Sequence, residues 1–112
     1  MVRIIKREEL KAKIDRRDDF KLVMAMDQWH FDACRIPGST LVPSKKDALK
    51  LLRKDEEIVV YCSDDACFTS RSVADFMERS GFTNVTHYPG GLRDWNEAGY
   101  PLEGEMASDM EH

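Results

Sequence analysis

Short apolar runs alternate along this chain with segments in which apolar residues recur every three or four positions. The runs predict strands at residues 2–5, 20–26, 40–42, 58–61 and 85–88. The intervening segments predict helices at residues 8–14, 29–33, after 44, at 70–79 and around 95. Such alternation is typical of an α/β fold with a mostly parallel sheet.

The helix predicted after Pro43 has a clear start and an apolar face. Ser44 is a favoured residue type for the N-cap, the position just before a helix. We expect the buried face of this helix to consist of Ala48, Leu49, Leu51 and Leu52.

Length and charge limit the classes of function. The 112 residues, with a net charge of −4, suffice for one domain, which we expect over residues 1–103. Residues 104–112 have little to bury, so we expect a disordered tail.

An acidic balance disfavours nucleic acid and anionic membranes as partners. Because the sequence shows neither an apolar run of about 20 residues nor a signal peptide, we expect a cytoplasmic protein.

The most informative stretch runs from the strand at 58–61 through Cys62 into a polar loop and a helix. In such a unit the loop N–H groups and the first turn of the helix converge beyond the strand and form an anion site. A thiol at that point has a lowered pKa and becomes nucleophilic near neutral pH. Thr69 and Ser70 are suitable N-cap types for the helix.

Five segments in order resemble the single-domain rhodanese-like family. They are RIPGSTLVP, VVYCS, TSRSVADFM, SGFTNV and YPGGLRDWNEAGYPLEG, and the resemblance covers residues 4–102. It implies a five-stranded, mostly parallel sheet flanked by helices on both faces, with the strand before Gly90 at the edge of the sheet. It also implies sulfur transfer without a cofactor.

In the chemistry that the resemblance implies, Cys62 is the nucleophile. Its thiolate takes sulfur from a small donor or from a persulfide-carrying protein, holds it as a persulfide, and passes it to a thiol acceptor. The persulfide needs inward-pointing N–H donors, as an oxyanion does. The substrate-binding loop that would supply them comprises Ser63, Asp64, Asp65, Ala66, Cys67, Phe68, Thr69 and Ser70. The sequence does not determine the oligomeric state.

The loop departs from the family pattern. It is about two residues longer than usual and contains Asp64 and Asp65. Carboxylates that face a thiolate raise its pKa and repel an anionic donor, which disfavours thiosulfate. Carboxylates that face water would only shape the turn. Arg71 could reach the mouth of the loop, although charged residues on helices usually face water, which we favour here.

A second departure precedes the short helix. Met24 and Met26 stand where the family often has Asp and Arg, and this replacement removes hydrogen bonds that usually hold the scaffold near the site.

The other two cysteines allow different roles. Cys67, five positions after Cys62, is either a resolving thiol that forms a Cys62–Cys67 disulfide or a small side chain packed under the loop. The resolving role leads to the alternative function, a non-enzymatic redox-sensing or interaction module. Cys34 precedes a segment that positions a strand, so we expect it to be structural.

Two further classes of site are disfavoured. A phosphatase loop ends in an Arg at a short fixed distance from the Cys, whereas the nearest Arg here, Arg71, is nine positions away. Zinc sites usually combine two close pairs of ligands, and only Cys62 and Cys67 form such a pair. We therefore expect no metal, and packing or surface roles for His30 and His87.

Overall fold

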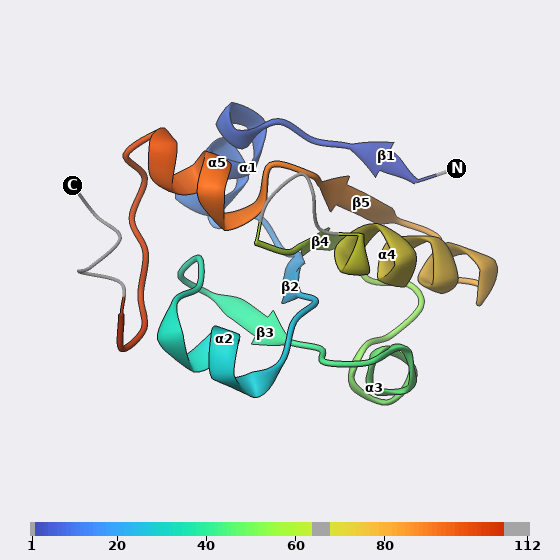
Figure 1. The fold of residues 1–112 in the computed structure, drawn as a ribbon. Coiled ribbons are helices and arrows are strands. Elements are labelled where there is room, and N and C mark those ends of the chain that lie inside the picture. Colours follow the sequence, from blue (N-terminus) through green and yellow to red (C-terminus); the bar gives the residue numbers. More distant parts are fainter. Residues whose placement is uncertain (1, 64–67, 107–112) are drawn as a thin grey trace.

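The computed structural model describes residues 2–63 and 68–106. Its strands are β1 (Arg3–Ile4), β2 (Lys21–Met24), β3 (Ser39–Leu41), β4 (Ile58–Tyr61) and β5 (Val85–Tyr88). Its helices are α1 (Arg7–Asp15), α2 (Gln28–Ala33), α3 (Lys45–Leu51), α4 (Thr69–Arg79) and α5 (Gly91–Glu97). Strands and helices alternate along the described chain, as the hydrophobic pattern predicts (Figure 1).

The strands form one sheet in the order β1-β5-β4-β2-β3, and every pairing is parallel. The five-stranded parallel sheet predicted from the resemblance is confirmed. The expectation that β5 lies at the edge is wrong, because β1 pairs with its outer side through Arg3–Thr86 and Ile4–His87. β4 is therefore the central strand, with two strands on either side.

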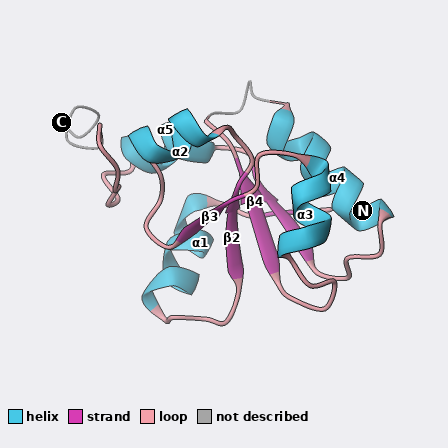
Figure 2. Cartoon of the chain, turned by 90° about the horizontal axis from the view of Figure 1, so that it is seen from below, coloured by secondary structure: helices cyan, strands magenta, loops and turns pink. Residues whose placement is uncertain are grey.

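Helices cover both faces of the sheet, and Figure 2 shows α1, α2 and α5 apart from α3 and α4. On the first face, Leu10 of α1 and Leu92 and Trp95 of α5 pack against the sheet. On the second face, Ala48 of α3 and Met77 of α4 do so. The strands β4 and β5 are buried at every position, as expected for central strands of a parallel sheet.

The predicted start of α3 is confirmed, and its predicted apolar face is partly wrong. Ser44 is the N-cap, and its hydroxyl accepts a hydrogen bond from the N–H of Asp47 at 3.3 Å. Ala48 and Leu52, four positions apart, are buried, but Leu49 and Leu51 are 48% and 57% exposed. The reason is geometric, since a helix of seven residues lying on a sheet buries only one narrow stripe.

The chain after Leu102 continues along α2. Glu103 and Arg35 exchange two backbone hydrogen bonds of 2.8 and 2.9 Å. The N–H groups of Glu105 and Met106 then donate to the carbonyls of Asp32 and Ala33 at 2.9 and 2.7 Å. We call residues 103–106 the C-terminal strap. The rest of the tail that we expect to be disordered, residues 107–112, lies outside the described residues.

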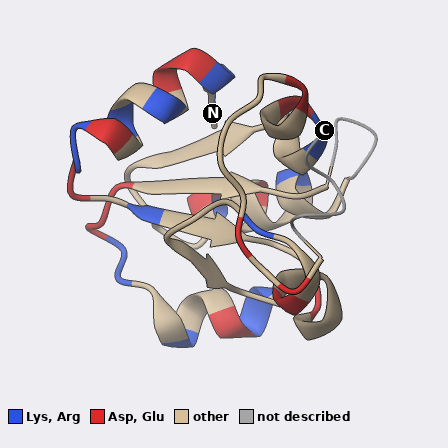
Figure 3. Cartoon of the chain, turned by 90° about the vertical axis from the view of Figure 1, so that its left-hand side faces the viewer, with Lys and Arg blue, Asp and Glu red and all other residues tan. Residues whose placement is uncertain are grey.

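Charged residues of both signs are interspersed on the side of the molecule in Figure 3. Among the described residues, no helix combines the length and the apolar character needed to cross a bilayer.

Candidate functional site

The candidate nucleophile, Cys62, directly follows β4 at the carboxyl end of the strand. The last residue of β4, Tyr61, is paired with Met24 on one side and Tyr88 on the other. Ligand sites of open parallel sheets lie beyond this edge. Cys62 is 2% exposed, and its sulfur is disulfide-bonded in this structure. Nucleophilic chemistry at Cys62 therefore requires its reduction first.

The structure describes both ends of the predicted substrate-binding loop. Ser63 is half-buried, Phe68 and Thr69 are exposed, and Ser70 is buried. The remaining predicted loop residues, Asp64, Asp65, Ala66 and Cys67, lie outside the described residues. The orientation of the two carboxylates and the role of the second loop thiol stay predictions.

The first turn of α4 follows the loop. Its N-cap is Phe68, which makes no side-chain capping bond, so the expectation that Thr69 or Ser70 caps the helix is wrong. Helical bonding starts where the N–H of Ser72 donates to the carbonyl of Phe68 at 2.9 Å. The preceding N–H groups, of residues 69–71, have no acceptor inside the helix. Together with the helix dipole they make this end electropositive and suited to an anion.

A buried hydrogen bond joins α4 to β5. The hydroxyl of Ser70 and Nε2 of His87 are 2.9 Å apart, and both side chains are buried. Burial lowers the pKa of His87, the nearby Arg71 lowers it further, and Asp75 acts in the opposite direction. The imidazole is therefore neutral at physiological pH. The sequence predicted a packing or surface role for this histidine. In the structure the Ser70 hydroxyl, which was expected to cap α4, bonds to it instead.

The start of α5 holds the backbone that follows β4. The N–H of Leu92 donates to the carbonyl of Cys62 at 3.1 Å, and the N–H of Arg93 donates to the carbonyl of Ser63 at 2.8 Å. These two bonds fix the backbone of the candidate nucleophile and of the residue after it. Because Gly91 has φ of +62°, in the left-handed region that favours glycine, the chain can turn sharply from β5 into α5.

Asp94 fixes α5 in turn. Its carboxylate accepts a 2.6 Å hydrogen bond from the hydroxyl of Tyr88 and pairs with Arg7 at 3.3 Å. Burial and then the Asp94 carboxylate raise the pKa of Tyr88, which stays protonated and donates. A Cβ on Gly90 would lie 2.5 Å from Cβ of Asp94, so this turn also needs a residue without a side chain.

A closed ring of three hydrogen bonds connects β4 to the segment before β3. The hydroxyl of Tyr61 accepts from the N–H of Ile36 at 3.1 Å and lies 2.6 Å from the hydroxyl of Ser39. The Ser39 hydroxyl donates to the carbonyl of Ile36 at 2.6 Å, so Tyr61 donates to Ser39. Burial raises the pKa of Tyr61 to about 12. The ring holds the residue before Cys62 rigidly.

Apolar packing occupies the end of β2. Met24 is fully buried and Met26 partly so, within the same cluster as Cys34. Cys34 is 4% exposed, which agrees with the expectation of a structural role. The nearby segment is held by Arg35, which donates to the carbonyl of Phe31 at 3.0 Å and pairs with Glu103 at 3.1 Å.

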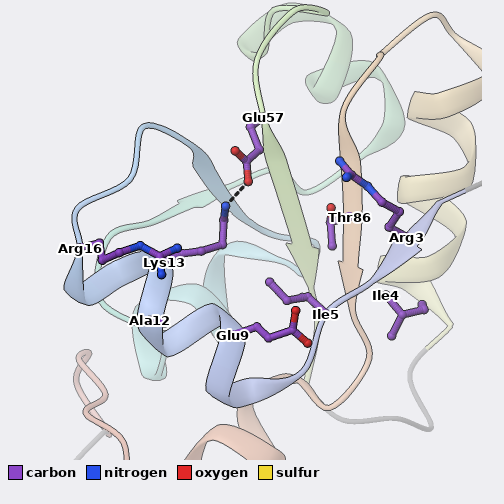
Figure 4. A pocket seen from close by; sticks show the side chains of 9 residues that line it. All are labelled: Arg3, Ile4, Ile5, Glu9, Ala12, Lys13, Arg16, Glu57 and Thr86. Atoms are coloured by element: carbon purple, nitrogen blue, oxygen red, sulfur yellow. Dashed lines mark ion pairs between the residues drawn. The ribbon is translucent and has the colours of Figure 1, made fainter.

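One pocket lies away from Cys62. Its volume is about 410 Å³, and it is bounded by α1, β1 and Thr86 of β5 (Figure 4). Glu57, at its wall, precedes β4, whereas Cys62 follows β4, so this pocket lies near the amino end of the central strand. Two of its cations are paired, Lys13 with Glu57 and Arg16 with Asp18.

Among the described residues, no three His, Cys, Asp or Glu side chains lie close enough together to hold a metal ion.

The family model of the rhodanese-like domain matches residues 6–98 of the chain. The chain is similar to the BH2092 protein of Bacillus halodurans, with 24% identity and a TM-score of 0.85 over 95% of this chain and 80% of that one. It is also similar to the rhodanese-like domain of the Alr3790 protein from Anabaena, with 25% identity and a TM-score of 0.83 over 96% and 83%.

The chain also shares its fold with part of a longer protein. The chain resembles part of a thiosulfate sulfurtransferase from Pseudomonas aeruginosa, with 22% identity and a TM-score of 0.74, over 92% of this chain and 20% of that one. No curated protein matches the chain significantly.

Proposed function

Because the chain belongs to the rhodanese-like domain family, we propose that it is a sulfurtransferase that carries a sulfane sulfur as a persulfide on Cys62. One observation supports this most strongly. Cys62 follows the central strand at its carboxyl end, and its backbone is tied there to the start of α5. The electropositive start of α4 follows the loop after Cys62.

The proposed reaction has two displacements. The thiolate of reduced Cys62 attacks the outer sulfur of the donor and forms a new S–S bond. The donor's own S–S bond breaks, and the remainder of the donor leaves with that bond's electron pair. An acceptor thiolate then attacks the outer sulfur of the Cys62 persulfide, and the Cys62 thiolate leaves. The acceptor ends as a persulfide, and the enzyme returns to its starting state.

We assign to the fold the stabilisation of negative charge on the Cys62 sulfur. The thiolate and the persulfide are both anions, and N–H groups at a helix start stabilise anions without needing to reorganise. The neutral His87 beneath the first turn adds no charge of its own. The turn is instead held in place by the hydrogen bond of His87 to Ser70.

The donor and acceptor are proposed by chemical class. The donor is a small sulfane compound or a persulfide-carrying protein, and the acceptor is a thiol. Asp64 and Asp65 disfavour thiosulfate if they face the sulfur. Since the reaction needs reduced Cys62, a reducing compartment such as the cytoplasm would suit it.

Mass spectrometry of the reduced protein tests the proposal. After incubation with inorganic polysulfide, cysteine persulfide or thiosulfate, we expect the mass of one added sulfur on the peptide that contains Cys62. Mercaptoethanol should remove this sulfur and become a persulfide. Thiosulfate should be the weakest of the three donors.

Two cysteine variants serve as controls. Cys62→Ser should gain no sulfur, whereas Cys34→Ala, which removes a buried core thiol, should gain it as the original protein does. If no donor adds sulfur to reduced Cys62, the proposal is wrong.

The disulfide at Cys62 favours a second candidate, a redox-sensing module. In that case Cys62 would cycle between thiol and disulfide, with Cys67 as the expected partner, and would accept no sulfur. Peptide mapping of the oxidised protein, together with the sulfur-loading experiment, separates the candidates. Reversible disulfide formation without any loading supports the module, whereas loading and release support the enzyme.

A further inference from the structure

An apolar pocket lies directly beside the candidate site. Its volume is about 450 Å³, within the range of small-molecule pockets. Ser63, the residue after Cys62, is part of its wall, and consecutive Cα atoms are about 3.8 Å apart. The described residues that line it come mainly from α2 and α5, with Met106 from the C-terminal strap: Met26, Trp29, His30, Ala33, Cys34, Ser63, Leu92, Arg93, Asn96, Glu97 and Met106.

Contacts around the pocket hold its walls in place. The N–H of Met106 donates to the carbonyl of Ala33, the last residue of α2, at 2.7 Å. On α2, the ring of Trp29 packs edge-on against His30 with 5.0 Å between centroids. Nδ1 of His30 lies 2.7 Å from the carboxylate of Asp27, which also caps the helix. A pocket formed in advance binds without an ordering cost.

Two large apolar side chains of this pocket remain open to solvent. Trp29 is 66% exposed and Met106 is 45% exposed. Exposed aromatic and Met side chains beside a cavity offer area that a ligand can cover. A ligand in this pocket would therefore gain affinity mainly by burying apolar surface.

The charges of the lining point to the kind of ligand. Among the described lining residues, Arg93 and Glu97 carry opposite charges and pair with each other at 3.4 Å. Both side chains are well exposed, at 70% and 61%. An anionic group such as a sulfonate or carboxylate therefore finds no uncompensated cation among them. An apolar body finds Met26, Trp29 and Leu92.

We propose that this pocket binds the sulfur acceptor, and that the acceptor is a small thiol with an aryl or alkyl body. The body lies against Trp29 and Met106, and the thiolate reaches the Cys62 persulfide past Ser63. This inference rests on the proposed sulfur transfer. Donors such as thiosulfate and inorganic polysulfide have no apolar body that could fill the pocket. We therefore assign the pocket to the acceptor, which reacts in the second displacement, and not to the donor.

Acceptor selectivity tests the proposal. Phenylmethanethiol and mercaptoethanol are both alkyl thiols, and they differ mainly in the apolar ring. With polysulfide as donor, we expect a lower KM for phenylmethanethiol. Trp29→Ala and Met106→Ala should each raise that KM, by roughly tenfold for Trp29→Ala because a large contact is lost. The KM for mercaptoethanol, which has no ring to lie against these side chains, should change far less.

Leu51→Ala is the matched control, since Leu51 is 57% exposed on α3 and does not line the pocket. It should change neither KM. The proposal is overturned if the two pocket variants leave the KM for phenylmethanethiol unchanged, or if they raise both KM values equally.

A binding measurement separates this proposal from the sulfur transfer itself. Benzyl methyl sulfide has the same ring and no thiol, so it can bind without reacting. We expect it to change the fluorescence of the exposed Trp29 in a saturable way, more weakly in Met106→Ala. Saturable binding without sulfur loading of Cys62 would refute the transfer and the acceptor role. Loading without binding would refute only the pocket assignment.

Discussion

Single side chains hold the end of β4 in place. The hydroxyl of Tyr61 closes a ring with Ile36 and Ser39, and the imidazole of His87 holds Ser70 in the first turn of α4. Both are polar groups in strands that are buried at every position. Polar groups in such positions are costly without partners, so their partners determine how neighbouring segments pack.

Removing the hydroxyl of Tyr61 should be costly. In Tyr61→Phe the N–H of Ile36 loses its acceptor inside the core, so we expect the free energy of unfolding to fall by about 1–3 kcal/mol. Chemical denaturation measures the change. Tyr100→Phe, at a partly exposed ring that packs against Trp95, should change the value by less. Equal effects would show that the ring of hydrogen bonds contributes nothing specific.

His87 should make stability depend on pH. Its pKa is lowered from 6.5 in the folded protein, so the unfolded chain binds the proton more readily. The free energy of unfolding should therefore fall as the pH drops below about 6.5, and level off below the folded-state pKa. His87→Gln cannot titrate and should lose this part of the slope. Denaturation at a series of pH values compares the two, and parallel slopes would contradict the prediction.

At the scale of elements, the starts of two helices and the C-terminal strap position the candidate site. The start of α5 binds the carbonyls of Cys62 and Ser63, and the start of α4 follows the loop. The strap, residues 103–106, bonds along α2 and completes the apolar pocket. These elements are short, so their positions depend on backbone contacts with other segments more than on their own helical or strand propensity.

The strap depends on Gly104. Its φ is +124°, and a Cβ there would lie 2.7 Å from the carbonyl oxygen of Ala33. Gly104→Ala should therefore displace the strap, speed hydrogen exchange at the N–H of Met106, and weaken binding of benzyl methyl sulfide. Gly99→Ala is the matched control, because Gly99 has φ of +77° with nothing within 4 Å of the added Cβ.

Both substitutions carry the strain of a left-handed residue, about 1–2 kcal/mol. Only Gly104→Ala should alter the strap. Slow exchange at Met106 in that variant would show that the close approach is unimportant.

At the scale of the whole molecule, strand order builds the candidate site. The order β1-β5-β4-β2-β3 makes β4 central. The residues that follow β2 and β4 therefore share one edge with the starts of α4 and α5. The pocket at this edge combines Met26, Ser63 and Leu92, which are far apart in the chain. The pocket of Figure 4 lies near the opposite end of β4.

The hydrophobic pattern was sufficient to predict most of the strands and helices and the fold class. The bounds of β4 and β5 match the predicted strands. For β4 the reason is clear, since a strand buried on both faces leaves a continuous apolar run. β2 covers only residues 21–24 of the predicted 20–26, because its end depends on its pairing with β3 and β4. Pairing is a property of other segments, and local sequence does not contain it.

The sequence alone determined the α/β architecture and the place of Cys62 between a buried strand and a helix, because both follow from local periodicity and local order. Tertiary structure alone decided that Ser70 bonds to His87, that β5 lies inside the sheet, that Leu49 and Leu51 face solvent, and that Met106 lines an apolar pocket. Each of these depends on a contact between residues distant in the chain, and such contacts arise only when the elements pack.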